Sequence, residues 1–333
     1  TMKLRREMTL CKRWLAGFVL ITVASCNMAV PMFSSTPKRD NPTETLPTIE
    51  LSATEGPTSV PSVTFALYAF RLRTGQWDIV TWDSDSEGVS KVTDDDATED
   101  SPRWNPDGTI LVFSSNRAGQ RGLYVYDANT QDIQEILQDQ NFNFGPSWSS
   151  DGLKVIYSAL HDENDDSERA RIKILDLADG TIETLMMRDG WYYSYPQFAP
   201  DGLAIYTVAS MNGTTDIVVR VIASSNERRL PFLEALTDFR LSPDGTMIAL
   251  GTYQGVCLGN LSSRRDDCMV IAEGEYVAYD WSDSGVLLYY AEANADGSTM
   301  MSYSPATGQR EVVGYVDGWH VVSMSLQPNV EGK

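Results

Sequence analysis

A short turn motif recurs along this chain at nearly regular intervals. Its best-preserved copy is Trp104-Asn-Pro-Asp-Gly108. Four more copies follow: Trp148-Ser-Ser-Asp-Gly152, Phe198-Ala-Pro-Asp-Gly202, Leu241-Ser-Pro-Asp-Gly245 and Trp281-Ser-Asp-Ser-Gly285. The residue before each Gly falls at 107, 151, 201, 244 and 284, in steps of 44, 50, 43 and 40. A period of this length indicates one small unit repeated to build a whole domain.

The residues of the motif suit a tight turn. Pro presets φ at the first corner, Asp accepts backbone N–H groups, and Gly permits the positive φ that follows. The bulky residue four positions before Gly ends a strand and can pack between neighbouring sheets. We therefore expect a structural role, and no catalytic role, for the turn aspartates Asp107, Asp151, Asp201 and Asp244.

Strand-like segments fill each repeat. An apolar segment follows every turn, as in TILVFSS (109–115), and a second follows it, as in GLYVYD (122–127). A weaker strand closes most repeats. Four strands at this spacing are typical of a β-propeller blade.

The two ends of the repeat region complement each other. Residues 65–92 supply three strands without a first one, and residues 319–329 supply a first strand without the other three. Joining them closes the ring and removes exposed sheet edges. The sequence therefore predicts an all-β fold over residues 63–330: a six-bladed propeller of four-stranded antiparallel blades, closed by its terminal strands.

The segment SPRWNPDGTILVFSSNRAGQRGLYVYD (101–127) resembles the TolB-type (WD40-like) propeller repeat, and the resemblance extends over residues 63–329. This repeat also occurs in the propellers of prolyl-oligopeptidase relatives. Two copies depart from it, with Ser284 in place of the turn Asp and Leu241 in place of the aromatic residue. TolB has an α/β domain before its propeller, whereas before the repeats of this sequence we expect only the polar tether. The resemblance therefore implies the fold rather than a role in the Tol system.

The N-terminal region has the composition of an export signal. Basic residues precede an apolar stretch from Trp14 to Ala24, which is too short to span a bilayer comfortably. The sequence Val23-Ala-Ser-Cys26 resembles the bacterial lipobox, in which the cysteine thiol is acylated. We interpret residues 1–25 as a lipoprotein signal peptide starting at Met2 or Met8, and Cys26 as the lipidated residue. The alternative is an ordinary secretory signal with an incidental cysteine.

Residues 26–62 are rich in Thr, Pro and Ser and lack sustained periodicity. This composition predicts a disordered tether between the lipid and the propeller. An exported protein meets an oxidising compartment, where a hairpin disulfide between Cys257 and Cys268 is expected; the alternative is two separate buried thiols.

Charge and histidine content narrow the functional classes. The chain has 46 acidic against 26 basic residues, a balance that repels phosphate backbones and disfavours nucleic-acid binding. His161 and His320 are the only histidines, and no nucleophile motif accompanies them. We therefore expect no catalytic activity, with a divergent hydrolase or lyase as the alternative.

No cofactor is expected, although the spacing of acidic residues in one loop is similar to that of a calcium-binding loop. Asp83, Asp85, Glu87 and Asp94 alternate in the manner of a calcium-binding loop, with Gly88 in the expected place. Two of the four depart from the preferred residue types, and no helices flank the loop. A solvated acidic turn is the favoured reading.

Aromatic residues gather in the segments that enter each blade. We expect about half of them to be core, and the rest to form a binding face around the channel mouth. The candidates are Phe142, Phe144, Trp191, Tyr192, Tyr193, Tyr195, Tyr276 and Trp319.

These observations lead to two functional hypotheses. The first is a non-catalytic, membrane-anchored propeller that serves as a protein-interaction module in a cell-envelope assembly, on the periplasmic or extracellular side. The second is a receptor for glycans or peptidoglycan fragments that uses the aromatic face.

Overall fold

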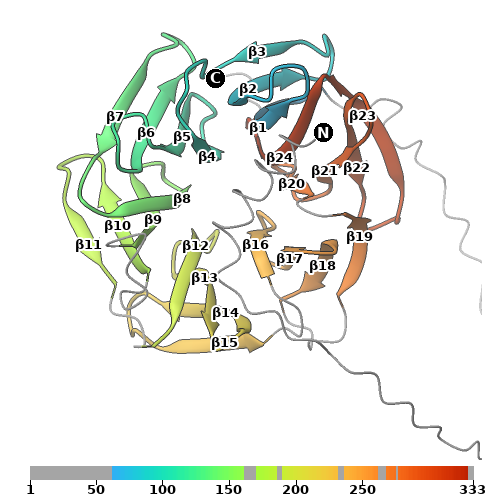
Figure 1. The fold of residues 1–333 in the computed structure, drawn as a ribbon. Coiled ribbons are helices and arrows are strands. Elements are labelled where there is room, and N and C mark those ends of the chain that lie inside the picture. Colours follow the sequence, from blue (N-terminus) through green and yellow to red (C-terminus); the bar gives the residue numbers. More distant parts are fainter. Residues whose placement is uncertain are drawn as a thin grey trace, which may run out of the picture. The chain divides into compact units, whose positions relative to one another are not determined.

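The computed structural model describes residues 62–160, 170–185, 190–231, 236–261, 268–274 and 277–328. The chain divides into two units, Thr1–Pro61 and Ser62–Lys333, and the described residues all belong to the second. They form β-strands only, arranged as six sheets around a central axis (Figure 1). In this part of the chain no helix has the length and apolar character needed to cross a bilayer.

Five blades are each built from four consecutive strands in antiparallel order. Blade 1 comprises β4 (Glu99–Trp104), β5 (Ile110–Ser115), β6 (Gly122–Asp127) and β7 (Ile133–Leu137). Blade 2 comprises β8 (Phe142–Trp148), β9 (Lys154–Leu160), β10 (Arg171–Asp176) and β11 (Ile182–Thr184). Blade 3 comprises β12 (Tyr192–Phe198), β13 (Ala204–Met211), β14 (Thr214–Val221) and β15 (Glu227–Pro231).

The second half of the chain continues the series. Blade 4 comprises β16 (Leu236–Leu241), β17 (Met247–Thr252), β18 (Gly255–Asn260) and β19 (Met269–Glu273). Blade 5 comprises β20 (Ala278–Trp281), β21 (Leu288–Ala293), β22 (Gly297–Tyr303) and β23 (Arg310–Asp317). The first strand of each blade lies nearest the axis (Figure 1).

Blade 6 closes the ring with strands from both ends of the repeat region. Its order is β24 (Trp319–Leu326), β1 (Thr64–Arg71), β2 (Trp77–Asp83) and β3 (Val89–Lys91). The antiparallel register of β1 with β24 runs from Phe65 opposite Leu326 to Arg71 opposite Trp319. The predicted six-bladed propeller, including closure by the terminal strands, is confirmed.

The core lies between blades. Among the described residues, six clusters of buried apolar side chains each join two neighbouring blades. For example, Val112 and Leu123 of blade 1 pack with Val155 and Tyr157 of blade 2. Because both faces of the middle strands are covered in this way, β5 and β9 are nearly continuous apolar runs rather than alternating ones.

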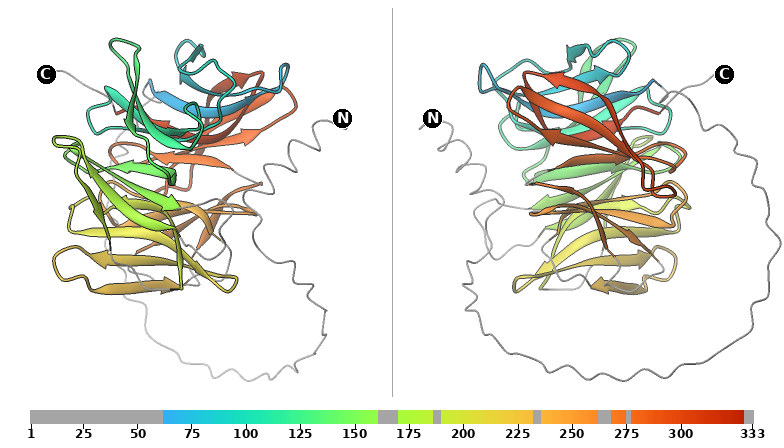
Figure 2. Two further views of the ribbon diagram at one scale, coloured as in Figure 1. Left: turned by 60° about the vertical axis from the view of Figure 1, so that its left-hand side comes forward. Right: turned by 90° about the vertical axis from the view of Figure 1, so that its right-hand side faces the viewer.

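The strands cross the disc from one face to the other (Figure 2). The turn motifs that follow the innermost strands all lie on one face, which we call the turn face. Their glycines take positive φ, between 68° and 72°. A Cβ on Gly152 would lie 3.6 Å from Pro106 of the preceding turn, and one on Gly245 would lie 3.8 Å from Pro200. The Pro and Gly of the motif therefore also let neighbouring turns pack closely around the axis.

The cysteines of blade 4 face each other. Cys257 on β18 is bonded to Cys268, which directly precedes β19, with 5.6 Å between their Cα atoms. The bond links the two outer strands of the blade.

Candidate functional site: the axial channel

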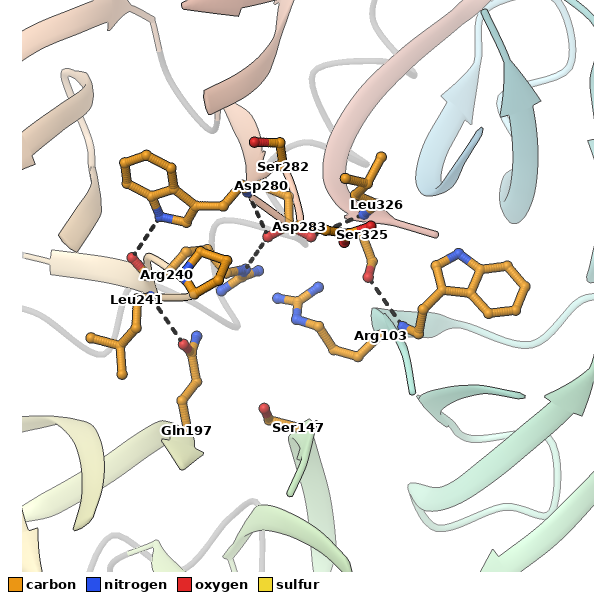
Figure 3. Close-up of a pocket in the computed structure, with 13 residues that line it drawn as sticks. Arg103, Ser147, Gln197, Arg240, Leu241, Asp280, Ser282, Asp283, Ser325 and Leu326 are labelled. Atoms are coloured by element: carbon orange, nitrogen blue, oxygen red, sulfur yellow. Dashed lines mark hydrogen bonds and ion pairs between the residues drawn. The ribbon is translucent and has the colours of Figure 1, made fainter. Parts of the chain in front are cut away.

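Each innermost strand contributes one side chain to the same level of the central channel. In blades 1 to 5 this residue directly precedes the bulky residue that begins the turn motif. In blade 6 it is Ser325, which precedes Leu326. These residues line a cavity of about 210 Å³ (Figure 3). We call them the axial ring: Arg103, Ser147, Gln197, Arg240, Asp280 and Ser325.

The strand geometry sends these side chains inward. Successive side chains on a strand point to opposite sides, so the bulky neighbour of each ring residue turns toward the adjoining blade. The indole N–H of Trp148 donates to the Arg103 carbonyl at 2.9 Å, and that of Trp281 donates to the Arg240 carbonyl at 3.2 Å. Each bond joins one blade to the preceding one and fixes the backbone beneath the ring.

The innermost strands of blades 1, 2 and 3 each contain a bulge just before the residue of the axial ring. Ser101, Gly145 and Tyr195 each precede a proline and each has positive φ, at 53°, 59° and 50°. The pairing with the second strand shifts register at these places, as at a β-bulge. The bulges re-aim the residues that follow, among them the ring members Arg103, Ser147 and Gln197.

The two arginines of the ring differ in their partners. Arg240 is 5% exposed, and its guanidinium lies 3.3 Å from Asp238 and 3.9 Å from Asp280. Its Nε is buried without a hydrogen-bond partner. Arg103 donates from Nη1 to the carbonyls of Pro102, at 2.5 Å, and Met324, at 3.3 Å. Among the described residues, no carboxylate lies within 4.0 Å of the Arg103 guanidinium.

The carboxylates of the channel are already engaged by the fold. Asp280 accepts the backbone N–H of Trp281 at 3.0 Å and that of Leu326 at 2.9 Å, which ties blade 5 to blade 6. Burial raises the pKa of Asp280, while the charge of Arg103 and these two bonds act in the opposite direction. Asp280 therefore holds strands in place and positions Arg240 from the side.

A second polar pair lies next to Arg240. The Tyr279 hydroxyl donates to Asp238 at 2.6 Å. Burial raises the pKa of Asp238, and the bond from Tyr279 partly offsets the effect. Burial, with the Asp238 charge, also holds the pKa of Tyr279 well above its usual value. Tyr279 consequently stays a neutral donor, and Asp238 is free to pair with Arg240.

A second cavity, of about 300 Å³, lies between the axial ring and the turn face. It shares Arg103, Ser147 and Leu241 with the first cavity and adds turn residues such as Pro106 and Pro200. The two together give the ring an approach from the turn face. The cavities hold donors and guanidinium groups, and no histidine stands beside the ring serines Ser147 and Ser325 among the described lining residues.

The sequence analysis did not identify the axial ring. The signal was present, because the residue before the bulky motif residue is polar in all six blades. Its meaning depends on the closure of the ring, which brings residues 40 to 50 positions apart to one level of the axis.

The predicted aromatic face divides between buried core residues and half-buried residues. Four of the rings are buried: Phe144, Trp191, Tyr193 and Trp319. Trp191 and Tyr193 fill the core between blades 2 and 3, and Trp319 lies in the core between blades 5 and 6. These side chains stabilise blade contacts.

The half-buried members of the set meet around Phe144. Phe142, Tyr192 and Tyr195 have ring centroids 5.9, 6.3 and 6.0 Å from that of Phe144. They belong to the innermost strands β8 and β12. Tyr276 lies outside the described residues, as do His161 and Cys26.

Three of the four carboxylates of the calcium-like loop have separate partners. Asp83 accepts the backbone N–H and hydroxyl of Ser86, Glu87 accepts the N–H of Tyr315, and Asp94 pairs with Lys91. Within the part of the chain that the structure describes, no three His, Cys, Asp or Glu side chains gather in a way that could hold a metal ion.

Comparison with known proteins agrees with this architecture. Residues 54–185 match the family model of the TolB beta propeller domain. These residues therefore match the TolB-type repeat, and the structure shows a six-bladed β-propeller. No curated protein matches it.

Several solved structures share the fold of this six-bladed propeller. TolB from Acinetobacter baumannii is 19% identical, with a TM-score of 0.66 over 80% of this chain and 67% of that one. A putative TolB from Agrobacterium tumefaciens is 18% identical, with a TM-score of 0.56 over 81% and 94%. A chain of a nidogen/laminin complex is 9% identical, with a TM-score of 0.59 over 80% and 98%. At these identities the likeness is one of fold.

Proposed function

We propose that this TolB-type propeller is an exported, lipid-anchored protein that binds a protein partner in an assembly of the cell envelope and catalyses no reaction. The observation that carries the proposal is a group of exposed apolar side chains on the turn face. The residue after the turn glycine is Leu153 in blade 2 and Leu203 in blade 3, and these side chains are 58% and 67% exposed.

Further apolar side chains extend this group. The N–H of Leu177 donates to the Leu153 carbonyl, and that of Ile222 donates to the Leu203 carbonyl, both at 3.0 Å. The outer turns of both blades therefore lie beside the inner ones. We call the exposed residues of blades 2 and 3 the apolar turn patch: Leu153, Leu177, Ile182, Leu203, Val221 and Ile222. Contiguous exposed apolar surface is typical of protein interaction sites.

Two features support export and anchoring. Disulfides such as Cys257–Cys268 persist mainly in oxidising compartments outside the cytosol. The lipobox-like Cys26 and the polar segment 26–62 supply an anchor and a spacer. Mass spectrometry of the mature N-terminus tests this part: we expect an acylated Cys26, and retention of residues 1–25 would contradict it.

Capture of a partner tests the interaction. The full chain is purified from membranes in mild detergent as the wild type, as Leu153→Asp/Leu203→Asp, and as Val312→Asp. Val312 is 51% exposed on β23 of blade 5 and serves as the control for an added charge on an apolar surface residue. We expect a stoichiometric protein partner with the wild type and the control, and its loss with the double variant. A partner retained equally by all three proteins would contradict the proposed surface.

The glycan receptor is the second candidate, favoured by one observation. Phe142, Tyr192 and Tyr195 remain partly exposed around Phe144, and aromatic rings of this kind can stack on sugars. Because Trp191 and Tyr193 are core residues, Tyr192→Ala is the informative change. Binding of peptidoglycan fragments that Tyr192→Ala abolishes, in a protein of unchanged thermal stability, would support the receptor over the interaction module.

A further inference from the structure

We propose that the axial ring contains a carboxylate-binding site formed by Arg103 and Arg240 and reached from the turn face. The site is distinct from the apolar turn patch, and it stands whether or not that patch binds a protein.

Two guanidinium groups with unused hydrogen-bond donors lie beside one cavity. Both arginines line the cavity of about 210 Å³ (Figure 3). Arg103 donates only to backbone carbonyls in the described structure, although a guanidinium has five N–H donors. Arg240 is 5% exposed, and its buried Nε lacks a hydrogen-bond partner. A buried donor without an acceptor is costly, and a bound anion would remove that cost.

The acidic groups around the cavity are held in place by the fold. Both carboxylate oxygens of Asp280 accept backbone N–H groups, and Asp238 is held by Tyr279. These acids lie within 4.0 Å of Arg240, whereas Arg103 has two backbone carbonyls as its hydrogen-bond partners. Ser147, Gln197 and Ser325 add neutral polar groups around the same space.

The charges around the cavity favour a carboxylate over a phosphate as the bound anion. Arg103 and Arg240 are matched by Asp280 and Asp283, so the charged side chains that line the cavity balance. The adjoining carboxylates of Asp280 and Asp283, which also line the cavity, would repel a doubly charged phosphate more strongly than a carboxylate. Planar guanidinium groups also match the two oxygens of a carboxylate.

Two sources share this chemistry: a free small organic acid, and an acidic side chain of a polypeptide that reaches the ring through the second cavity. Propionate represents the first source. The acetylated and amidated pentapeptide Ala-Ala-Glu-Ala-Ala represents the second, with its Gln-containing twin as the neutral control.

Binding is measured on the full chain in mild detergent by NMR of the arginine Nε–H signals and by calorimetry. The variants are Arg103→Gln, which removes one guanidinium charge, and Ser147→Asp, which keeps both arginines and adds a negative charge to the ring. Arg73→Gln is the control, because Arg73 is exposed between β1 and β2, at the end of the blade away from the turn face. Thermal unfolding verifies that each protein is folded, and Ser147→Asp decides the matter if Arg103→Gln fails to fold.

We expect saturable binding of at least one acidic probe to the wild type and to Arg73→Gln. Binding should be weaker by about ten- to a hundredfold in Arg103→Gln and Ser147→Asp, which is the range for a charged hydrogen bond. Propionate binding alone identifies a free acid, and peptide binding alone identifies a polypeptide. The proposal is overturned if neither probe saturates, or if the Gln-containing peptide binds as well as the Glu-containing one. It is also overturned if phosphate binds more tightly than both probes, or if the two ring variants bind the probes like the wild type.

Discussion

At the scale of single residues, the turn motif combines backbone geometry with local hydrogen bonds. Asp151 illustrates it: its carboxylate accepts the Ser149 hydroxyl at 2.5 Å and the N–H of Leu153 at 3.0 Å. These bonds, the first of them most strongly, lower the pKa of Asp151, and the equivalent bonds lower the pKa of Asp244. The motif therefore favours the ionised aspartate in the folded state.

This shift predicts a pH dependence of stability. A carboxyl group with a lowered folded pKa stabilises the fold above its unfolded pKa of about 3.9 and loses this effect as the pH falls through the folded value. Asp151→Asn removes the titrating group, so the wild type should lose more unfolding free energy between pH 5 and pH 2 than the variant does. Urea unfolding across this pH range measures the difference. Parallel curves would mean that the turn bonds do not favour the ionised form.

Gly145 tests the bulges above the axial ring. It has φ of 59°, and an added Cβ would lie 3.0 Å from the Tyr195 ring. Gly180 has φ of 73° with open space around it, which makes Gly180→Ala a control for backbone strain alone. We expect Gly180→Ala to cost about 1 kcal/mol and Gly145→Ala to cost about 2 kcal/mol or more, since the second also crowds a neighbouring blade. Thermal unfolding gives both values, and equal losses would show that Tyr195 moves aside freely.

At the scale of strands, the closing strand β24 and the disulfide of blade 4 stabilise different contacts. The strand β24 provides the innermost edge of blade 6 and the core contacts of blade 5 at the same time. The disulfide joins two strands that are already neighbours in sequence. We therefore expect closure to contribute more to stability than the disulfide does.

Met324 is the probe for closure. It is fully buried on β24 in the core between blades 5 and 6. Met324→Ala should lower the free energy of unfolding by about 2–5 kcal/mol, the usual range for a buried methionine. The exposed Val312→Ala should stay within about 0.5 kcal/mol of the wild type. Denaturant unfolding provides the comparison, and a small effect at Met324 would indicate that the terminal strand is only loosely packed.

Reduction tests the disulfide. The bond closes a segment with a sequence separation of 11 residues, so the chain-entropy model predicts that its loss costs about 2–3 kcal/mol. The melting temperature of the wild type should fall on adding a reductant to the level of Cys257→Ser/Cys268→Ser. The double variant itself should not respond to the reductant. A wild type that melts at the same temperature in both conditions would mean that the bond adds nothing to stability.

At the scale of the whole molecule, the propeller presents two kinds of surface on its turn face. The apolar turn patch lies over blades 2 and 3, and the approach to the axial ring lies at the centre. The first is suited to a protein surface, and the second to a single acidic group. Both lie on the face opposite the segments that enter each blade, where the sequence analysis had placed the binding site.

The sequence by itself determined the number of blades, the turn chemistry and closure by the terminal strands. These features depend on local patterns, because a Pro-Asp-Gly turn or an apolar strand favours the same conformation at any position in the chain. It could not show that Trp191 and Tyr193 are core residues, because the blade that covers them is built from other segments. Only the tertiary structure decided the axial ring: Arg103 and Arg240 stand 137 positions apart, and closure of the ring alone brings them to one cavity.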